Sequence, residues 1–221
     1  MPLNRVCLVF TLLLVLSAPL AQAAGPDQVY IGLTTIQPFN PNEAPEQKWE
    51  YLVMYPEGLA MREIPVGGLD YDNVAKLAEK HDSKVGTYTR TEDGMQITWG
   101  RSSRKNQTWD LQGSGTTWTR GRDTTFKRAD RVNKDAIKGI WKQKSILPSN
   151  MMDMSGSEFI FRSNGEFEQG SRHGRYELDG YTLTLHDSKG ETKRYAIYRW
   201  PWGAGAIGID NRVYTLLQSR Q

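Results

Sequence analysis

The chain has one cysteine among its 221 residues, and this residue, Cys7, lies close to the start. The rest of the chain therefore lacks the thiols that disulfide bonds, thiolate metal sites and cysteine nucleophiles require. Histidine is also scarce, because His81, His173 and His186 are the three in the sequence and no two have metal-ligand spacing. We predict no metal site, no cofactor and no catalytic residue. An enzyme without a recognisable motif is kept as the third functional hypothesis.

A large charge of one sign is also missing. The sequence has 28 Lys and Arg residues against 25 Asp and Glu residues, a formal net charge of +3. A protein that binds polyanions by general electrostatic attraction carries a much larger basic excess, so we predict no nucleic-acid partner. The charge is nevertheless uneven, because residues 25–84 hold 5 basic and 10 acidic side chains whereas residues 85–145 hold 13 and 6.

Long apolar runs are absent except at the start of the chain. Arg5 precedes residues 6–20, which are almost continuously apolar, and Ala21-Gln22-Ala23 follows with the small-x-small pattern of a cleavage site. This order is typical of a secretory signal peptide, which we assign to residues 1–23 with cleavage near Ala23. We expect no transmembrane segment after its removal. We therefore expect a periplasmic or secreted protein. The absence of cysteine from the exported chain favours the bacterial periplasm.

The sequence does contain many aromatic residues and glycines, with 7 Trp, 10 Tyr and 21 Gly. Apolar and polar residues alternate in short runs separated by turns such as Asn164-Gly165 and Asp179-Gly180, which is the signal of hairpin-connected strands. In the second half we expect strands over 139–146, 158–162, 166–168, 172–178, 181–186, 192–198, 206–209 and 212–216.

The first half repeats this plan. Gly86 and Tyr88 match Gly174 and Tyr176, and the offset stays at 86 residues from Ile97/Leu183 (183 − 97) to Trp109/Tyr195 (195 − 109). A constant offset is what an internal repeat predicts. The fold class is therefore all-β, with two tandem small antiparallel meander barrels or curled sheets over 24–132 and 133–221. One short helix, over about 70–82, is inserted in the first and serves either as a lid over a cavity or as a plug in an open barrel end.

A resemblance to a known family begins at the second domain. Asn133, Ile137, Gly139 and Trp141 form the pattern N-x-x-x-I-x-G-x-W, which resembles the opening of lipocalin and calycin barrels. Residues 133–217 are similar to exported bacterial lipocalin-like proteins, whose function is mostly undefined, and 28–130 resemble them loosely. The resemblance implies that the Trp packs across the closed end of a barrel. The strands are shorter than in true lipocalins, and the T-D-x-x-Y motif is missing.

The leading functional hypothesis is a non-catalytic exported protein that holds a small apolar or amphipathic ligand at a barrel mouth. Large aromatic side chains of the second domain are the candidate ligand-binding residues, although a small barrel can also be filled by its own side chains. They are Trp141, Phe159, Phe161, Tyr176, Tyr181 and Tyr195.

The alternative hypothesis is a protein-interaction module of the cell envelope, such as an inhibitor, an immunity protein or an assembly factor. Its partner would bind the basic, tryptophan-rich block or an aromatic loop, and the candidate residues are Arg101, Arg104, Arg120, Arg122, Trp200 and Trp202. The basic block, residues 85–145, has another interpretation, in which it docks on the acidic segment 25–84 of the same chain.

Met151, Met152 and Met154 form a thioether cluster of a kind that suits Cu(I). Methionines in a loop also pack on the rim of a barrel, which is the other interpretation of this cluster.

Overall fold

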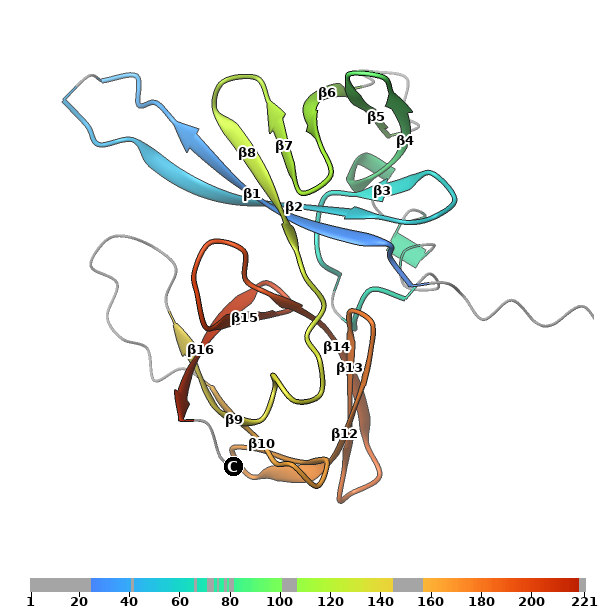
Figure 1. Ribbon diagram of the computed structural model, residues 1–221, viewed down its shortest axis with the longest axis vertical. Coiled ribbons are helices and arrows are strands. Elements are labelled where there is room, and N and C mark those ends of the chain that lie inside the picture. The colour runs from blue at the N-terminus through green and yellow to red at the C-terminus, as the bar shows by residue number, and fades with distance from the viewer. Residues whose placement is uncertain are drawn as a thin grey trace, which may run out of the picture.

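A computed structural model of the chain describes residues 25–40, 42–65, 67–70, 82–100, 107–144 and 157–218, together with Val74, Lys76, Leu77 and Glu79. These residues form two closed antiparallel barrels of eight strands each (Figure 1). The first contains β1 (Gln28–Ile36), β2 (Glu46–Met54), β3 (Leu59–Met61), β4 (Val85–Thr91), β5 (Gly94–Trp99), β6 (Gln107–Ser114), β7 (Thr117–Arg120) and β8 (Thr124–Ala129). A 3-10 turn, η1 (Asp82–Lys84), precedes β4.

The second barrel contains β9 (Gly139–Lys144), β10 (Glu158–Phe161), β11 (Glu166–Gln169), β12 (Arg172–Asp179), β13 (Thr182–Asp187), β14 (Thr192–Arg199), β15 (Ala206–Ile209) and β16 (Arg212–Gln218). Each strand pairs with the next along the chain, and the last closes on the first. The prediction of two tandem antiparallel barrels is confirmed, and their strands lie on either side of the expected boundary at 132/133.

Several sequence predictions fall outside the described residues. They are the signal peptide over 1–23, Arg101 and Arg104, and the methionine cluster. The helix expected over about 70–82 lies largely outside them as well and stays a prediction, although Val74 is fully buried and Leu77 packs against the same buried cluster. Among the described residues, no helix combines the length and the apolar character needed to cross a membrane.

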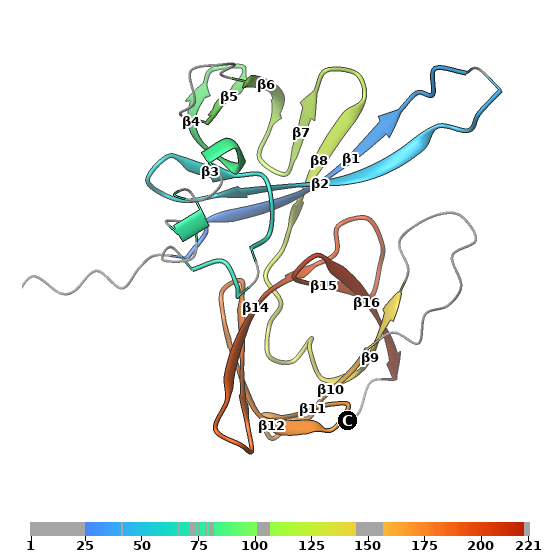
Figure 2. The ribbon, with the colours of Figure 1, turned by 180° about the vertical axis from the view of Figure 1, so that it is seen from behind.

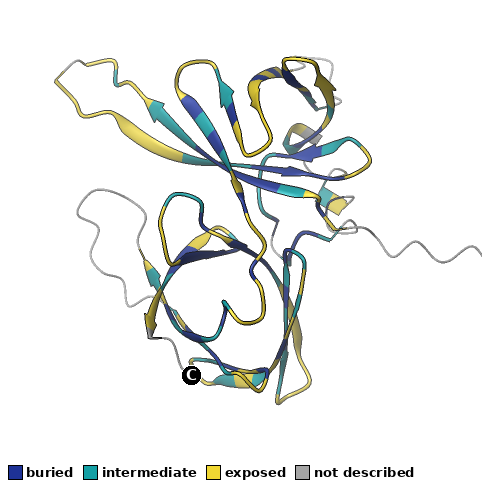
Figure 3. Ribbon diagram, in the orientation of Figure 1, coloured by how far each residue is buried: buried dark blue, intermediate teal, exposed yellow. Residues whose placement is uncertain are grey.

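Both barrels are filled by their own side chains because strand residues alternate between inside and outside. The first barrel encloses a buried cluster that includes Tyr30, Leu52, Trp99, Trp118 and Phe126. The second encloses another cluster, rich in aromatic and branched side chains, that includes Trp141, Phe159, Phe161, Leu183 and Ile209. Figure 3 shows these buried stretches on the barrel walls, whereas the tip of the projecting β1–β2 hairpin is exposed.

Both barrels contain the same turn, which is held by the same three hydrogen bonds. Gly58, with φ of 77°, ends the turn between β2 and β3, and its N–H donates to the Tyr55 carbonyl at 3.2 Å. Tyr88 of β4 then donates its N–H to the Gly58 carbonyl at 2.8 Å and its hydroxyl to the Tyr55 carbonyl at 2.9 Å. In the second barrel the same three bonds, at 3.1, 2.9 and 3.1 Å, are made by Gly165, Tyr176 and Arg162.

Gly86 and Gly174 hold equivalent places at the start of β4 and near the start of β12. A Cβ on Gly86 would lie 2.4 Å from the Thr98 carbonyl oxygen, and one on Gly174 would lie 2.0 Å from the His186 carbonyl oxygen. These obstacles are main-chain atoms of a paired strand, so they cannot rotate away. We expect Gly86→Ala and Gly174→Ala each to lower the free energy of unfolding by about 1–3 kcal/mol in urea titrations.

Gly203→Ala is the matched control for this pair, because the new Cβ would lie 3.7 Å from the Trp200 ring, an ordinary contact. Its stability should stay within about 0.5 kcal/mol of the wild type. Equal stability of all three variants would contradict the close strand approach at the two glycines.

The barrels pack against each other through a third buried cluster, to which both contribute. Trp49 of β2 meets Trp200 edge-on, with ring centroids 4.8 Å apart, and Trp202 at 5.9 Å. The Trp202 indole N–H donates to the Ile31 carbonyl at 2.9 Å, and the buried Tyr181 hydroxyl donates to the Ala129 carbonyl at 2.8 Å. From behind, Figure 2 shows the chain after β8 running from the first barrel into the second.

The β15–β16 turn brings a carboxylate to this contact. Asp210 has a φ of 52° and accepts from the Ala196 N–H at 2.9 Å, while the Tyr198 hydroxyl donates to its carbonyl at 2.6 Å. The Tyr51 hydroxyl donates to the next carbonyl, that of Asn211, at 3.4 Å. Burial raises the pKa of Asp210 to about 6, although the Ala196 N–H and Arg212 act to lower it.

Because the pKa of Asp210 is higher in the folded than in the unfolded chain, the folded state favours its protonated form. Ionisation therefore removes stability as the pH rises from about 4 through about 6. Asp210→Asn keeps the acceptor oxygen and tolerates the positive φ. We expect this variant to exceed the wild type in stability by about 1–3 kcal/mol at pH 7.5 and by much less at pH 4.5, measured by urea unfolding. A difference that does not change with pH would contradict the burial of this carboxyl group.

Candidate ligand-binding site

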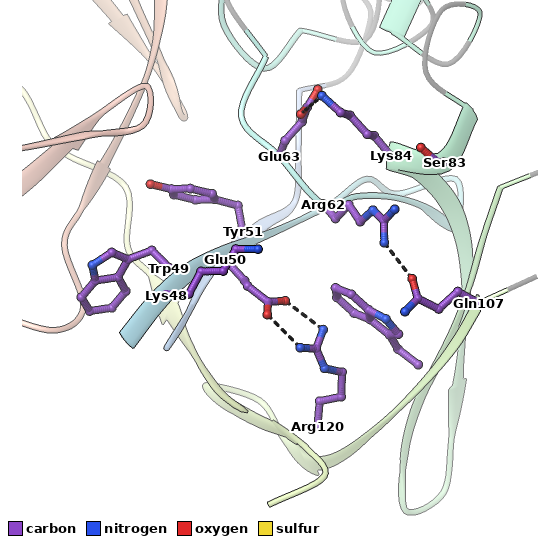
Figure 4. A pocket seen from close by; sticks show the side chains of 11 residues that line it. Lys48, Trp49, Glu50, Tyr51, Arg62, Glu63, Ser83, Lys84, Gln107 and Arg120 are labelled. Carbon is purple, nitrogen blue, oxygen red and sulfur yellow. Dashed lines mark hydrogen bonds and ion pairs between the residues drawn. The ribbon is translucent and has the colours of Figure 1, made fainter. Parts of the chain in front are cut away.

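The first barrel contains an open pocket of about 670 Å³, which we call the mouth pocket. It lies between β2, the chain after β3, the η1 turn, β6 and β7 (Figure 4). Its volume is within the range of small-molecule sites. The lining residues are Lys48, Trp49, Glu50, Tyr51, Arg62, Glu63, Ser83, Lys84, Gln107, Trp109 and Arg120.

The polar lining continues the inward-facing rows of the barrel core. Along β2, Met54 and Leu52 are buried apolar residues, and the next inward positions toward the mouth are Glu50 and Lys48. On β7 the inward residue after Trp118 is Arg120. The alternation of a strand is thus kept while the residue type changes from apolar to charged at the mouth.

A bidentate ion pair joins opposite walls of the mouth pocket. Arg120 donates from Nη1 and Nη2 to the two carboxylate oxygens of Glu50, at 2.8 and 2.9 Å. The Thr34 hydroxyl donates to Glu50 at 2.7 Å, and Arg120 also donates to the Thr124 hydroxyl at 3.1 Å. Burial alone would raise the pKa of Glu50, but the hydrogen bonds from Arg120 and Thr34 outweigh it and hold this pKa below its ordinary value. Glu50 is therefore a fixed anion rather than a proton carrier.

Aromatic faces support the two arginines of the site. The Arg120 guanidinium carbon lies 4.0 Å from the centroid of the Trp109 ring, within the range of a cation–π contact. Arg62 lies 5.6 Å from the Trp99 centroid and donates to the Gln107 side-chain oxygen at 2.9 Å. Figure 4 shows Arg62, Gln107, Glu50 and Arg120 turned toward the same space. The guanidinium groups are thus held in place before any ligand arrives.

The mouth pocket has a positive excess. Glu50 pairs with Arg120, and Glu63 pairs with Lys84. Within the described part of the chain, Lys48 and Arg62 form no salt bridge. Four basic and two acidic side chains line the pocket, so its charges favour an anionic ligand.

The acidic side chains of the mouth pocket are held by basic partners. Over the residues that the structure describes, no group of three or more His, Cys, Asp or Glu side chains could hold a metal ion. The carboxylates Glu50 and Glu63 are each bound to a basic partner. The arrangement is suited to hold a ligand.

A second cleft, of about 560 Å³, lies between the barrels. Its charges include Arg131, Glu177 and Asp179, together with Asp70 and Arg194, which pair with each other at 3.2 Å. Acidic side chains are in slight excess there, and no arginine is held on a carboxylate and an aromatic face together as Arg120 is. The mouth pocket is therefore the stronger candidate.

The aromatic residues that the sequence analysis selected lie elsewhere. Trp141, Phe159, Phe161 and Tyr176 are buried together inside the second barrel, with Tyr195 packed against them. Phe159 stacks on Phe161 with centroids 5.6 Å apart, so these rings fill the interior. Tyr181 lines the cleft between the barrels. These six residues thus do not share one open site.

The residues selected for a partner surface are also dispersed. Arg120 lines the mouth pocket, and Arg122 is exposed in the β7–β8 turn. Trp200 and Trp202 contact the first barrel, where Lys127 lies 4.1 Å from the Trp202 centroid. The Arg120–Glu50 pair agrees with the interpretation that the basic block docks on the acidic segment of the same chain.

Glu50, Arg62 and Gln107 are not among the candidate residues that the sequence predicts. A signal for Glu50 was present, because Lys48 and Glu50 continue the inward row of Leu52 and Met54 with charged residues. Arg62 follows β3, and Gln107 begins β6. The contact between these two side chains depends on the closure of the barrel.

Comparisons with protein-family models, curated proteins and solved structures find no match to this chain.

The Glu50–Arg120 pair is a point where stability can be tested. Its side chains are 18% and 24% exposed, so removing the cation leaves a largely buried carboxylate. We expect Arg120→Met to lower the free energy of unfolding by about 1–3 kcal/mol at pH 7. Because the pKa of Glu50 is lowered in the fold, this contribution is present above the ordinary pKa of about 4.5 and is lost as the pH falls below it.

Urea titrations at pH 7 and pH 3 measure this difference. Arg122→Met, which removes the same charge from an exposed turn, should stay within about 0.5 kcal/mol of the wild type at both pH values. If the two variants were equally stable at pH 7, the ion pair would not contribute to the fold.

Proposed function

We propose that this protein is a non-catalytic exported binding protein that holds an anionic amphipathic ligand in the mouth pocket of the first barrel. The observation that carries the proposal is the pair of preorganised arginines, Arg62 and Arg120, beside tryptophan faces in a pocket with net positive charge. A carboxylate or a similar anion would meet the guanidinium groups, and its apolar part would contact Trp109. A purely apolar ligand would desolvate the charged lining and supply no counter-ion for Lys48 and Arg62.

The exported location is part of the proposal, supported by the signal-like sequence of residues 1–23. The lipocalin-like identity is proposed as well, and the start of the second barrel supports it. The Asn133 side chain accepts from the Ala136 N–H at 2.6 Å, and buried Ile137 accepts from the Trp141 indole N–H at 2.6 Å. This turn holds the buried Trp141 beside Ile137, and the bond supports the proposed likeness to the Gly-x-Trp pattern.

A protein-interaction role, proposed second, is supported by a different feature. The β1–β2 hairpin projects away from both barrels (Figure 1), and Phe39 near its tip is fully exposed. Asn40 holds the tip, because its carbonyl accepts from the Glu43 N–H at 3.0 Å and its side chain accepts from the Asn42 N–H at 3.1 Å. Phe39→Ser should abolish capture of such a partner and leave the mouth pocket unchanged.

The binding proposal is tested with three probes that share a ten-carbon chain: decanoate, decanol and decyltrimethylammonium. We expect decanoate to change the tryptophan fluorescence and to raise the melting temperature, because it alone supplies a carboxylate for the positive excess of the mouth pocket. Arg62→Gln should weaken decanoate binding at least about fivefold, since one of the two guanidinium groups is lost.

Arg122→Gln is the matched control, since it removes the same charge from an exposed turn, and its decanoate affinity should equal that of the wild type. Equal responses to decanoate and to decyltrimethylammonium would contradict the proposal, as would no response to either probe.

A further inference from the structure

Most of strand β2 has a free edge. It is nine residues long and pairs with β1 along its whole length, from Met54 opposite Gln28 to Glu46 opposite Ile36. On the other side it pairs with β3 at two residues only, Val53 and Met54. Within the described part of the chain, no other strand pairs with the remaining seven residues of β2.

The direction of the main-chain groups follows from two hydrogen bonds. The Met54 carbonyl accepts from the Asp27 N–H at 2.9 Å on the β1 side, and the Tyr55 N–H donates to the Leu59 carbonyl at 2.9 Å on the β3 side. Alternate residues of an antiparallel strand direct both main-chain groups to the same side. The N–H and C=O groups of Trp49 and Tyr51 therefore point, like those of Tyr55, to the free edge.

The chain after β3 leaves this edge open. β3 ends at Met61, and the next residue, Arg62, donates its N–H to the Lys84 carbonyl at 3.0 Å. This bond continues the β3–β4 register by one residue, whereas among the described residues the β2–β3 pairing ends at Val53 opposite Met61. Trp49 and Tyr51 line the mouth pocket together with Arg62 and the Glu63–Lys84 pair. The unpaired edge of β2 lies where β3 would pair with it if β3 continued.

We infer that the ligand of the mouth pocket is an acidic peptide in extended conformation, which pairs with the free edge of β2 as an added strand. The inference rests on the proposed function, because it assigns a chemical class to the ligand of that same pocket. Main-chain hydrogen bonds to Trp49 and Tyr51 would align the peptide. Its alternate side chains would point into the barrel mouth, as Lys48 and Glu50 do.

The cations of the mouth pocket favour acidic peptides over other peptides. Lys48 and Arg62 are the lining cations that form no salt bridge within the described residues, and both lie beside this edge. Acidic side chains at alternate positions of the added strand would meet them. The equivalent strand of the second barrel, β10, is only four residues long, and two of its described residues lack a partner on the β11 side, against seven in β2. The long unpaired stretch of β2 and the cations beside it favour the first barrel as the place of the proposed site.

The test uses the full chain and a capped pentapeptide of alternating glutamate and valine, titrated by tryptophan fluorescence. Two N-methylated isomers accompany it, one methylated at positions 2 and 4 and the other at positions 3 and 5. An added strand turns only one of these sets toward β2. We expect one isomer to lose affinity at least about tenfold and the other to bind like the parent peptide. A peptide of alternating lysine and valine should bind at least about tenfold more weakly.

The outcomes separate this inference from the proposed function. If both isomers bind like the parent peptide, or both lose affinity alike, strand addition is wrong. If decanoate binds and the peptide does not, the mouth pocket remains a ligand site and its peptide assignment is wrong. If neither binds, both proposals are wrong.

Discussion

An eight-stranded barrel has room inside for little more than its own side chains, and the two halves of this protein fill that room differently. The second barrel is filled by apolar rings such as Phe159 and Phe161. The first is filled by apolar residues as far as Leu52 and then ends in the Glu50–Arg120 pair. A charged pair cannot be covered without cost, so this end stays open to water and forms the mouth pocket.

The contact between the barrels covers part of the outer face of β2. Trp49 points away from the first barrel and packs on Trp200 and Trp202 of the second. The second barrel thus fixes one face of β2, and β1 fixes one edge. The other edge lies at the mouth pocket, where the proposed ligand would bind. In this account the second barrel supports β2, which is the strand of the first barrel that would pair with the proposed ligand.

The sequence predicted the architecture because its signals are local. Alternation within short runs and turns such as Asn164-Gly165 gave two tandem barrels, and the Gly86/Gly174 match placed equivalent strands. The candidate site was not predictable in the same way. The aromatic residues selected as ligand contacts, such as Trp141 and Phe161, fill a core, since residue type alone does not distinguish a filled barrel from a hollow one. The mouth pocket joins Glu50, Arg62 and Arg120, and only barrel closure brings these distant positions together.

Hydrogen exchange of the β2 amides, resolved by NMR on the full chain without ligand, tests the central claim most directly. If β2 has a free edge, the amides of Gln47, Trp49 and Tyr51 exchange fast, whereas those of Lys48, Glu50 and Leu52, which face β1, exchange slowly. Slow exchange at all six positions would show that this edge is already paired, and the account of an open barrel mouth would be wrong.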